Sequence, residues 1–271
     1  DENGIALSLF KPTLNIKKKS KFKIVSLNGD VFKFLKFIWT NSKSIFHLHQ
    51  PRSAFLLTVI TLFLPKKFKR VVTVHNNFNT FKFLNKILIL FNIIFAKKVT
   101  FVSKSSYDSF PHLLKNIFKH KCLAITNGVD LSRINNFLSN NSAKKSNESQ
   151  TNLVYIGKLY KQKNHDKILS IFSKLPHKFM LTIIGEGPER DRLEKLINKL
   201  DIKDRVTITG IIDRSQVYQI LIDSDIFVST ALWEGMPVGV LESMACSLPI
   251  ILSDIPPHNE IQDKHPLKII F

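Results

Sequence analysis

The stretch from Thr230 to Pro249, TALWEGMPVGVLESMACSLP, holds residue types that could bind a ligand with both negative charge and hydroxyl groups. Two acids, Glu234 and Glu242, stand eight positions apart, and a Gly-Met-Pro turn lies between them. Pro237 fixes its φ at about −65° and so favours the start of a helix, whose free N–H groups attract an anion. The amides expected to face that anion are those of Gly235, Met236, Val238 and Gly239.

The two glutamates suit hydroxyl groups, because an ionised carboxylate only accepts hydrogen bonds. Glu242 falls within the first turns of the predicted helix, and Glu234 precedes the turn at the same cleft. A ligand with a diphosphate and many hydroxyls is a sugar nucleotide. The alternative is structural: Glu242 would only complement the helix dipole, and Glu234 would be solvated.

A second candidate segment, GKLYKQKN, follows a short apolar strand that ends at Gly157. Glycine lets the backbone approach a ligand, and Lys158 and Lys163 place two cations beside the strand end, which suits a diphosphate. A solvated basic loop is the alternative. In IIGEGPERDRLEK a Gly-x-Gly could cradle phosphate, but the third glycine of the dinucleotide fingerprint is missing. A plain turn with Pro188 at the helix start is favoured there.

Strands and helices alternate along residues 153–254. Apolar strands are expected at 153–157, 179–185, 205–210, 225–230 and 249–254, and helices at 165–175, 189–200, 215–224 and 239–247. Such alternation is typical of a parallel sheet covered on both faces. The first half repeats the pattern less clearly, with strands at 21–27, 44–50, 70–76, 98–103 and 121–128, and helices at 30–40, 53–64, 80–96 and 105–118.

Ligands of such open sheets bind outside the carboxyl ends of the strands. Polar residues and glycines gather at these expected ends, as a ligand cleft requires. They are Gly157, Gly185, Gly210, Ser229 and Thr230 in the second half, and His47, His49, His75, Asn76, Asn127 and Gly128 in the first. His47 and His49 have no secure role, because a histidine at a strand end is often only hydrogen-bonded locally.

A chain of 271 residues, 44% of them hydrophobic, suffices for two ordinary domains with buried cores. The polar segment NNFLSNNSAKKSNESQTN lacks periodicity and predicts a linker over residues 136–152, between domains at 1–135 and 153–271. Residues 1–150 hold 25 Lys and Arg against 6 Asp and Glu, whereas residues 151–271 hold 15 of each. The excess charge of +19 therefore lies in the first half, which suggests different partners for the two domains.

Cysteine spacing and hydropathy exclude several classes of protein. Cys122 and Cys246 lie far apart without partners at metal-ligand spacing, so neither a disulfide framework nor a structural zinc site is expected. A reducing, cytoplasmic setting is the default for such a chain. The apolar runs at 53–65 and 87–96 are shorter than the roughly 20 residues of a membrane span, and they predict buried helices.

Taken together, these motifs resemble glycosyltransferase family 4, a group of retaining transferases with the two-domain GT-B fold. The likeness rests on WEGMPVGVLESMACSLPIILSDIPPHNEI, GKLYKQKN, LTIIGEGPERDRLEKLI and VTITGIID, and TVHN and ITNGVD resemble segments of the family's first domain. It covers roughly Val71 to Ile261. The resemblance implies an α/β chain with two Rossmann-like domains, whose parallel sheets face a cleft.

The resemblance also implies a role for each matching residue. Lys158 and Lys163 would bind the donor diphosphate beside Gly157, Glu242 would hold the ribose hydroxyls, and the backbone near Ile211 would contact the base. The transferred sugar would be held by Glu234 and by the backbone of Gly235, Met236, Pro237 and Val238. His75 would reach the sugar or the reacting centre from the other domain. The expected catalytic residues are therefore His75, Glu234, Lys158 and Lys163.

The implied reaction moves a sugar from a nucleotide-diphosphate sugar to a glycan or lipid-linked acceptor in polysaccharide biosynthesis, with retention of anomeric configuration. The lysines and the helix start would stabilise the leaving diphosphate. No Asp-x-Asp motif lies near the site, so neither a metal nor another cofactor is expected. Lys158 stands where the family often has Arg, which keeps the charge but loses a bidentate fork. Ser243 and Ser247 stand where Ala and Gly are usual.

The ends of the chain and its basic half carry two further expectations. The chain is expected to lack the family's first strand and glycine-rich loop, and to stop after a strand at LKIIF without the closing helices. A donor held by the second domain does not explain the basic first half, so peripheral binding to the inner face of the cytoplasmic membrane is expected. The cations suited to anionic headgroups are Lys17–Lys19, Lys66, Lys67, Lys69, Arg70, Lys97 and Lys98.

Two alternatives stay open. A basic nucleic-acid-binding protein accounts for the charge, but no recognised motif spacing is present and few Tyr or Trp interleave with the cations, so nucleic acid is not an expected partner. A noncatalytic relative would bind a sugar nucleotide without transferring the sugar. The presence of Glu234, Glu242, Lys158 and Lys163 argues against that reading.

Overall fold

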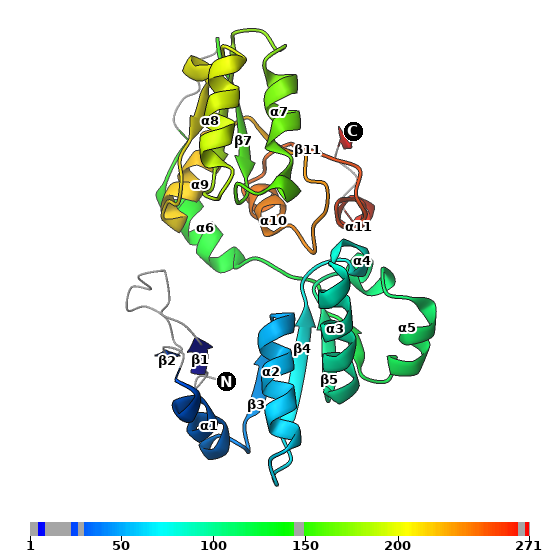
Figure 1. Ribbon diagram of the computed structural model, residues 1–271. Coiled ribbons are helices and arrows are strands. Elements are labelled where there is room, and N and C mark those ends of the chain that lie inside the picture. Colours follow the sequence, from blue (N-terminus) through cyan, green and yellow to red (C-terminus); the bar gives the residue numbers. More distant parts are fainter. Residues whose placement is uncertain (1–4, 9–22, 27–29, 144–148, 265–268, 271) are drawn as a thin grey trace.

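The computed structural model describes residues 5–8, 23–26, 30–143, 149–264 and 269–270. It has two α/β domains, the first coloured from blue to teal and the second from green to red (Figure 1). The chain enters the second domain through α6 (Leu131–Asn140) and returns toward the first at α11 (Pro256–Lys264). The α/β fold with two parallel-stranded domains that the sequence predicts is confirmed.

The first domain is built on parallel strands. A four-stranded sheet takes β3 (Ile45–Leu48), β4 (Lys69–Val74), β5 (Lys98–Phe101) and β6 (Cys122–Ala124) in chain order, and β1 (Ile5–Ser8) pairs with β2 (Lys23–Ser26). The helices are α1 (Val31–Thr40), α2 (Pro51–Leu62), α3 (Phe83–Phe95), α4 (Lys104–Asp108) and α5 (His112–Phe118), with a 3₁₀ turn at Phe78–Thr80.

The first domain differs from expectation at two places. The strand β1, which pairs in parallel with β2, was not expected, because its short apolar run gives little signal in the sequence. The single helix expected over residues 105–118 is two helices, α4 and α5, which are separated at Pro111. Proline lacks an N–H and disfavours helical backbone in the residue before it, so the helix cannot run through.

The two apolar runs form α2 and α3, as the sequence predicts. Each helix buries one side: Leu57 of α2 packs with Phe46 of β3, and Ile93 of α3 packs with Val99 of β5. Within the described ranges, no helix combines the length and the apolar composition of a membrane span.

The second domain contains a six-stranded parallel sheet in the order β12-β11-β10-β7-β8-β9. Its strands are β7 (Thr151–Ile156), β8 (Phe179–Ile184), β9 (Val206–Ile208), β10 (Ile226–Ser229), β11 (Ile250–Leu252) and β12 (Ile269–Ile270). Helices α7 (His165–Phe172), α8 (Arg190–Lys199), α9 (Arg214–Ile222) and α10 (Val238–Ala245), and 3₁₀ turns at Lys161–Lys163 and Lys203–Arg205, connect them. This is the doubly wound order, whose direction of winding reverses between β7 and β10.

The central strand explains the unbroken apolar runs of this domain. Leu153, Val154 and Tyr155 of β7 are all buried, since helices cover both faces of the sheet. Val154 belongs to one core cluster and Leu153 and Tyr155 to the other. The alternating side chains of β7 therefore hold the two helical layers on opposite faces.

The polar segment expected to be a linker begins inside α6. Asp130 caps this helix by accepting a hydrogen bond from the Arg133 amide at 3.0 Å, and Ile134 is fully buried in a core cluster of the second domain. The helix escaped prediction because Asn and Ser fill most of its surface positions, and only Ile134, Phe137 and Leu138 mark its inner side.

The two domains touch through backbone groups. On α11, Glu260 accepts hydrogen bonds from the amides of Lys104 and Ser105 at the start of α4, at 3.1 and 2.8 Å. Ser103 Oγ donates to the Gly235 carbonyl at 2.7 Å. The tightest approach is that of Gly235, where an added Cβ would lie 1.7 Å from the His75 carbonyl oxygen. The Gly-Met-Pro turn of the second domain thus lies against the end of β4 in the first.

Gly235→Ala should separate the domains, because the backbone oxygen of His75 cannot move aside as a flexible side chain would. We expect a cost on the order of 1–3 kcal/mol in the free energy of unfolding, as for an overpacked core. Thermal unfolding and the radius of gyration from small-angle X-ray scattering measure the two effects. Gly128→Ala is the matched control, since an added Cβ there meets nothing within 4 Å. Identical behaviour of the two variants would refute the close contact.

Candidate functional site

The candidate site lies where β7 and β10 separate, at the switch point of the second sheet. Gly157 follows β7, and the loop after β10 runs from Thr230 to the start of α10. At Gly157 an added Cβ would lie 3.1 Å from the Lys163 side chain, so the glycine makes room for that lysine. Ligands of doubly wound sheets bind at this point.

An ion pair between Lys163 and Glu234 occupies the centre of the site. Their side chains are only 18% and 10% exposed, although they come from loops 71 residues apart. Gln162 braces the second loop by donating to the Trp233 carbonyl at 2.7 Å. A buried ion pair is stable only when its geometry is good and its remaining polar atoms are satisfied. The structure therefore brings together two of the predicted residues in one charged pair.

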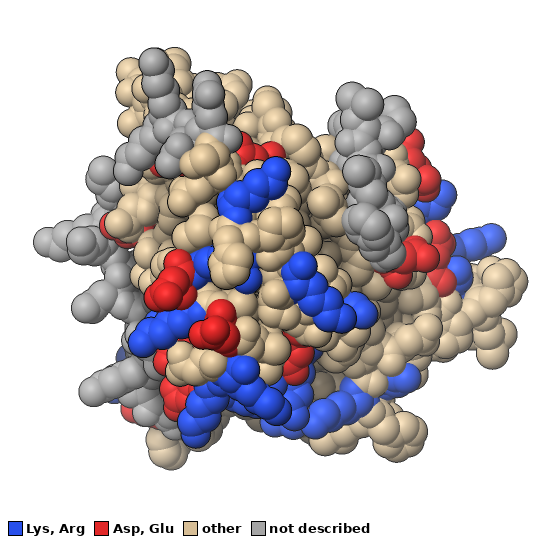
Figure 2. All heavy atoms as spheres, turned by 90° about the horizontal axis from the view of Figure 1, so that it is seen from above, with Lys and Arg blue, Asp and Glu red and all other residues tan. Residues whose placement is uncertain are grey.

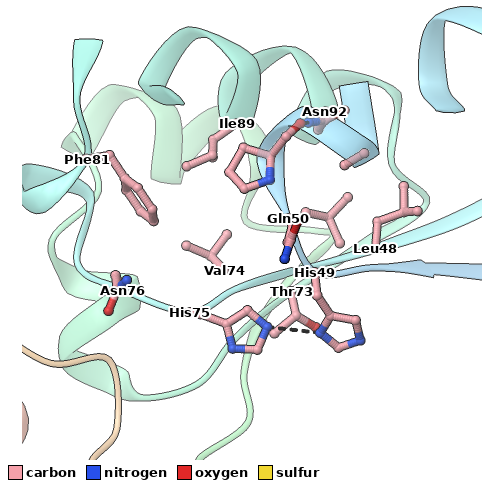
Figure 3. A pocket seen from close by; sticks show the side chains of 13 residues that line it. Leu48, His49, Gln50, Thr73, Val74, His75, Asn76, Phe81, Ile89 and Asn92 are labelled. Carbon is pink, nitrogen blue, oxygen red and sulfur yellow. Dashed lines mark hydrogen bonds between the residues drawn. The ribbon is translucent and has the colours of Figure 1, made fainter. Parts of the chain in front are cut away.

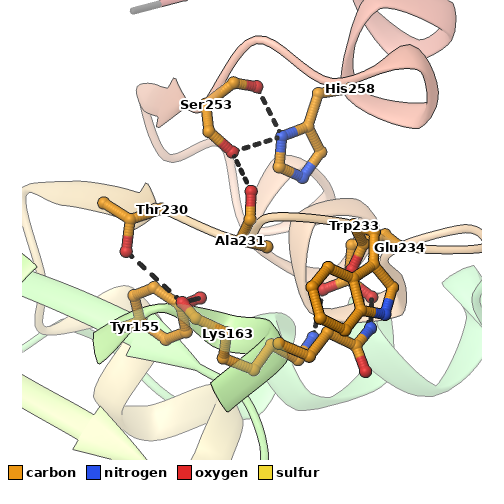
Figure 4. A network of polar contacts seen from close by, with 9 residues as sticks. Tyr155, Lys163, Thr230, Ala231, Trp233, Glu234, Ser253 and His258 are labelled. Carbon is orange, nitrogen blue, oxygen red and sulfur yellow. Dashed lines mark hydrogen bonds and ion pairs between the residues drawn. The ribbon is translucent and has the colours of Figure 1, made fainter. Parts of the chain in front are cut away.

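The main chain around Lys163 is held from both neighbouring strands (Figure 4). Tyr155 of β7 donates its hydroxyl to the Lys163 carbonyl at 2.7 Å, and Thr230 donates to the Asn164 carbonyl at 2.9 Å. Asn164 itself has a left-handed backbone, with φ of 53°, which few residues other than glycine adopt readily. These contacts fix the direction in which the Lys163 side chain leaves its loop.

The loop after β10 is held by a second set of hydrogen bonds. Ser253 Oγ donates to the Ala231 carbonyl at 2.6 Å, and the His258 Nδ1–H donates to the Ser253 carbonyl at 2.8 Å (Figure 4). His258 is fully buried on α11, the helix that also contacts the first domain through Glu260. This network therefore links the position of Glu234 to the domain contact.

The second acid, Glu242, is buried on α10 and is paired with Arg214 at the start of α9. The Arg214 guanidinium donates to Glu242 Oε1 at 2.6 Å. Burial raises the pKa of Glu242 above its ordinary value, and the Arg214 charge acts in the opposite direction. Sequence reasoning missed Arg214 because the two residues are 28 positions apart and only the fold joins them.

The Gly-Met-Pro turn has the form that the sequence predicts. Pro237 is the N-cap of α10, and the helix begins at Val238. Gly235, Met236 and Pro237 are buried, and Val238 is partly exposed. Because the first N–H groups of a helix have no partner within it, they are directed at the space beyond the turn. Glu234, the partner of Lys163, directly precedes that turn in the sequence.

Four other residues of the predicted motifs lie outside the centre of the site. Lys158 is exposed, one residue beyond Gly157, and Ile211 is 74% exposed beyond β9. Gly185 and Gly187 serve backbone packing, since an added Cβ would lie 2.0 Å from the Gly157 oxygen and 2.5 Å from the Leu159 oxygen. The Gly-x-Gly segment is therefore closely packed against the backbone that follows β7.

Three histidines of the first domain cluster at the strand ends near the domain contact. His49 Nδ1 and His75 Nε2 lie 2.9 Å apart, and the His47 and His49 rings lie 4.2 Å apart between centroids. The pair borders a cavity of ≈ 140 Å³ at the carboxyl ends of β3 and β4 (Figure 3). Burial lowers the pKa of all three histidines below the ordinary value, so they are neutral at pH 7. In the described part of the chain, His, Cys, Asp and Glu side chains form no group of three or more suited to hold a metal.

The sequence of this chain is similar to those of known glycosyltransferases. Residues 138–266 match the family model described as glycosyl transferases group 1. Over 186 residues the chain is 27% identical to the N-acetylgalactosamine-N,N'-diacetylbacillosaminyl-diphospho-undecaprenol 4-alpha-N-acetylgalactosaminyltransferase of Campylobacter jejuni, covering 68% of this chain and 48% of that enzyme. The chain spans about half the length, or less, of the curated relatives it matches.

Two solved structures are similar over 99% of this chain. The sucrose-phosphate synthase of Thermosynechococcus elongatus has a TM-score of 0.76 at 15% identity, with 75% of its chain covered. Anabaena HepE in complex with UDP-glucose has a TM-score of 0.75 at 13% identity, with 85% covered. At these identities the likeness shows the fold, which is GT-B.

Proposed function

We propose that the protein is a retaining transferase of glycosyltransferase family 4 that moves a sugar from a nucleotide-diphosphate sugar to a glycan or lipid-linked acceptor. The observation that carries the proposal is the buried Lys163–Glu234 pair at the switch point, beside the start of α10 and against the end of β4. A cation, an acceptor of hydroxyl protons and a helix start meet there, and a sugar diphosphate needs all three.

The donor would bind the hydrogen-bonding atoms of Lys163 and Glu234 that their ion pair does not use. An ammonium group has three N–H donors, so Lys163 can hold Glu234 and still bind a phosphate oxygen. The first amides of α10 add further donors for the diphosphate, and Glu234 Oε2 can accept from a sugar hydroxyl. Glu242 would hold the ribose hydroxyls with the oxygen that does not face Arg214. Lys158 adds a second cation at the solvent side.

The chemistry would be electrostatic. The bond between the sugar and the diphosphate breaks more easily when negative charge can build on the leaving group, and a fixed positive field stabilises that charge. Lys163 and the start of α10 would supply this field from the protein itself, without a metal or other cofactor. The domain contact would exclude water, since hydrolysis competes with transfer to the acceptor.

The relatives support a donor and an acceptor of this kind. HepE was solved with UDP-glucose, and the name of the Campylobacter enzyme describes an acceptor carried on diphospho-undecaprenol. A role in polysaccharide biosynthesis, at the inner face of the cytoplasmic membrane, fits such an acceptor.

A thermal-shift screen of sugar nucleotides tests the proposal directly, because a ligand that binds only the folded chain raises its melting temperature. We expect one or more nucleotide-diphosphate sugars to stabilise the protein, and a radiolabelled sugar to be transferred to a lipid-linked acceptor, with EDTA present or absent. Stabilisation by an oligonucleotide alone would instead favour a nucleic-acid-binding protein. Binding of the donor without transfer or hydrolysis would favour a noncatalytic relative.

Lys163→Ala should lower the rate of transfer by about 10²–10³, the usual loss when one fixed charge on a leaving group is removed. Lys163→Arg should retain part of the activity, since it keeps the charge. The measurement is initial rate at saturating donor. Lys161→Ala is the control, because Lys161 is an exposed lysine of the same turn. Equal rates for Lys163→Ala and Lys161→Ala would remove Lys163 from the site.

Glu242→Gln should weaken donor binding, whereas Glu234→Gln should slow transfer more than it weakens binding. Glu242→Gln also removes the negative charge that pairs with Arg214. The variant should therefore be less stable to unfolding as well as weaker in donor binding. Isothermal titration with the donor and steady-state kinetics separate the two effects. Normal binding and normal transfer by both variants would contradict the roles given to the two acids.

We expect the first domain to bind an anionic membrane surface. Phe32, Phe63 and Phe83 are 85%, 83% and 78% exposed, and exposed lysines such as Lys67 and Lys82 lie near them in the sequence. By contrast, acidic and basic side chains are mixed over the second domain, the part of the molecule seen from above in Figure 2. Aromatic side chains with lysines beside them suit the interface of an anionic bilayer.

Not every cation predicted for this surface is available to it. Arg70 donates to Thr61 Oγ1 and to the Phe95 carbonyl, so it serves the packing of β4, α2 and α3. Lys66 lies over the Trp39 ring at 3.9 Å. Lys67, Lys69, Lys97 and Lys98 remain exposed, and Lys17–Lys19 lie outside the described residues.

Sedimentation with vesicles tests the membrane surface. The protein should bind vesicles that contain anionic lipid better than neutral ones, and binding should weaken as salt rises, with each nearby Lys contributing about 1 kcal/mol. The double variant Phe63→Ser, Phe83→Ser should bind less, while Ile171→Ser on the second domain serves as the control. Equal binding to both kinds of vesicle, or none, would contradict the proposal.

A further inference from the structure

We infer that His49 is a positioning residue for His75: it holds Nε2 of the His75 ring and leaves Nδ1 as the nitrogen that meets the substrate. This inference rests on the proposed function and on the expectation from the sequence that His75 reaches the transferred sugar. It starts from the 2.9 Å contact between His49 Nδ1 and His75 Nε2, which joins the ends of two neighbouring strands (Figure 3).

The contact determines which nitrogen of His75 is available. At 2.9 Å one ring nitrogen donates and the other accepts, so the two facing nitrogens share a single proton. Nε2 of His75 is therefore occupied whichever ring donates. Nδ1 lies on the other side of the ring, away from His49 (Figure 3). A sugar hydroxyl that reaches His75 must use Nδ1.

His49 is itself held in place by a chain of contacts. The His47 ring lies 4.2 Å from it, at an interplanar angle of 40°. His47 Nε2 lies 2.6 Å from Thr73 Oγ1, and that hydroxyl lies 2.7 Å from Thr100 Oγ1 on β5. Because β3, β4 and β5 are adjacent strands, the sheet supports the His49 ring through the side chains of His47, Thr73 and Thr100.

Packing alone does not account for this arrangement. All three histidine side chains are exposed, so their contacts contribute little to a buried core. Partial burial of the His75 ring lowers its pKa, and the neighbouring rings of His49 and His47 lower it further. A lowered pKa favours the neutral form of the ring. The His75 carbonyl lies against Gly235, the residue after Glu234. The backbone of His75 therefore lies at the domain contact of the proposed site.

The difference in charge between His75 and Lys163 indicates a task for Nδ1. Lys163 and the start of α10 belong to the second domain and attract the diphosphate, while a neutral imidazole contributes no charge that competes with them. Nδ1 would exchange a hydrogen bond with a hydroxyl of the transferred sugar and so help to orient it. His49 would act only through His75, by keeping that nitrogen in one place.

Substitutions that imitate one nitrogen at a time test the assignment. An Asn side chain places its amide near the position of Nδ1, and a Gln side chain reaches the position of Nε2. We expect His75→Asn to keep more transfer activity than His75→Gln. A higher rate for His75→Gln would show that Nε2 is the working nitrogen and would overturn the inference.

The role of His49 is tested in the same way. His49→Ala should lower kcat by ~10-fold with a smaller change in donor KM, the size of one lost positioning hydrogen bond. His49→Asn, which can still bond to His75 Nε2, should recover most of the rate. The control is His112→Ala, since His112 lies on α5 and bonds only to its neighbour Asn116 in the described structure. Equal rates for His49→Ala and His112→Ala would overturn the inference.

Nitrogen NMR separates failure of this inference from failure of the proposed function. In protein labelled with ¹⁵N at histidine, the two-bond correlations of each ring report which nitrogen carries the proton. The His75 signals should change in His49→Ala and stay unchanged in His112→Ala, with no substrate present. If they change but no donor binds, the hydrogen bond exists and the proposed function fails. If His75 is unaffected by His49→Ala, the inference fails whatever the activity.

Discussion

The close approach of the Gly235 backbone to the His75 carbonyl is the constraint on which the rest of the structure depends. Because an added Cβ would lie 1.7 Å from that oxygen, the turn before α10 and the end of β4 meet as bare backbone. Glu234 precedes this glycine, and His75 supplies the other side of the contact. One steric requirement therefore brings together the loop that carries Glu234 and the strand end that carries His75.

The two domains bring different chemistry to that contact. The second domain supplies two ion pairs: Lys163 with Glu234, and the buried Glu242 with the half-exposed Arg214. Such pairing is what allows ionised side chains to exist away from water. The first domain supplies neutral imidazoles, whose pKa values are lowered below the ordinary value. A ligand across the contact thus meets fixed charges on one side and uncharged hydrogen-bonding groups on the other.

The same division holds on a larger scale. The net positive charge lies in the first half of the chain, while the second half is balanced. Yet the cations of the first domain are spread over its helices and strand starts, and its part of the site is uncharged. The surface charge of this domain and its part of the candidate site are therefore separate features. Some of its cations, Arg70 above all, serve packing instead.

Much of the fold could be predicted from local pattern. The alternation of apolar strands and amphipathic helices depends on neighbouring residues, so both parallel-stranded domains and most of their elements were predicted. The misses have local causes too. β1 is too short to stand out, Pro111 divides the helix expected over residues 105–118, and the Asn-rich surface of α6 resembles a linker. Glycine and proline at 235–237 also mark a turn before a helix by their own backbone preferences.

Only part of the candidate site could be predicted from the sequence. Residue types at strand ends pointed to Lys163, Glu234, Glu242 and His75, because a doubly wound sheet gathers its strand ends at one edge. The sequence did not show that Glu242 would face Arg214, that Glu234 would pair with Lys163, or that His49 would bond to His75. Those partners are 28, 71 and 26 residues apart. No local preference relates them, and only the packing of strands and loops in three dimensions decides which charges and which nitrogens meet.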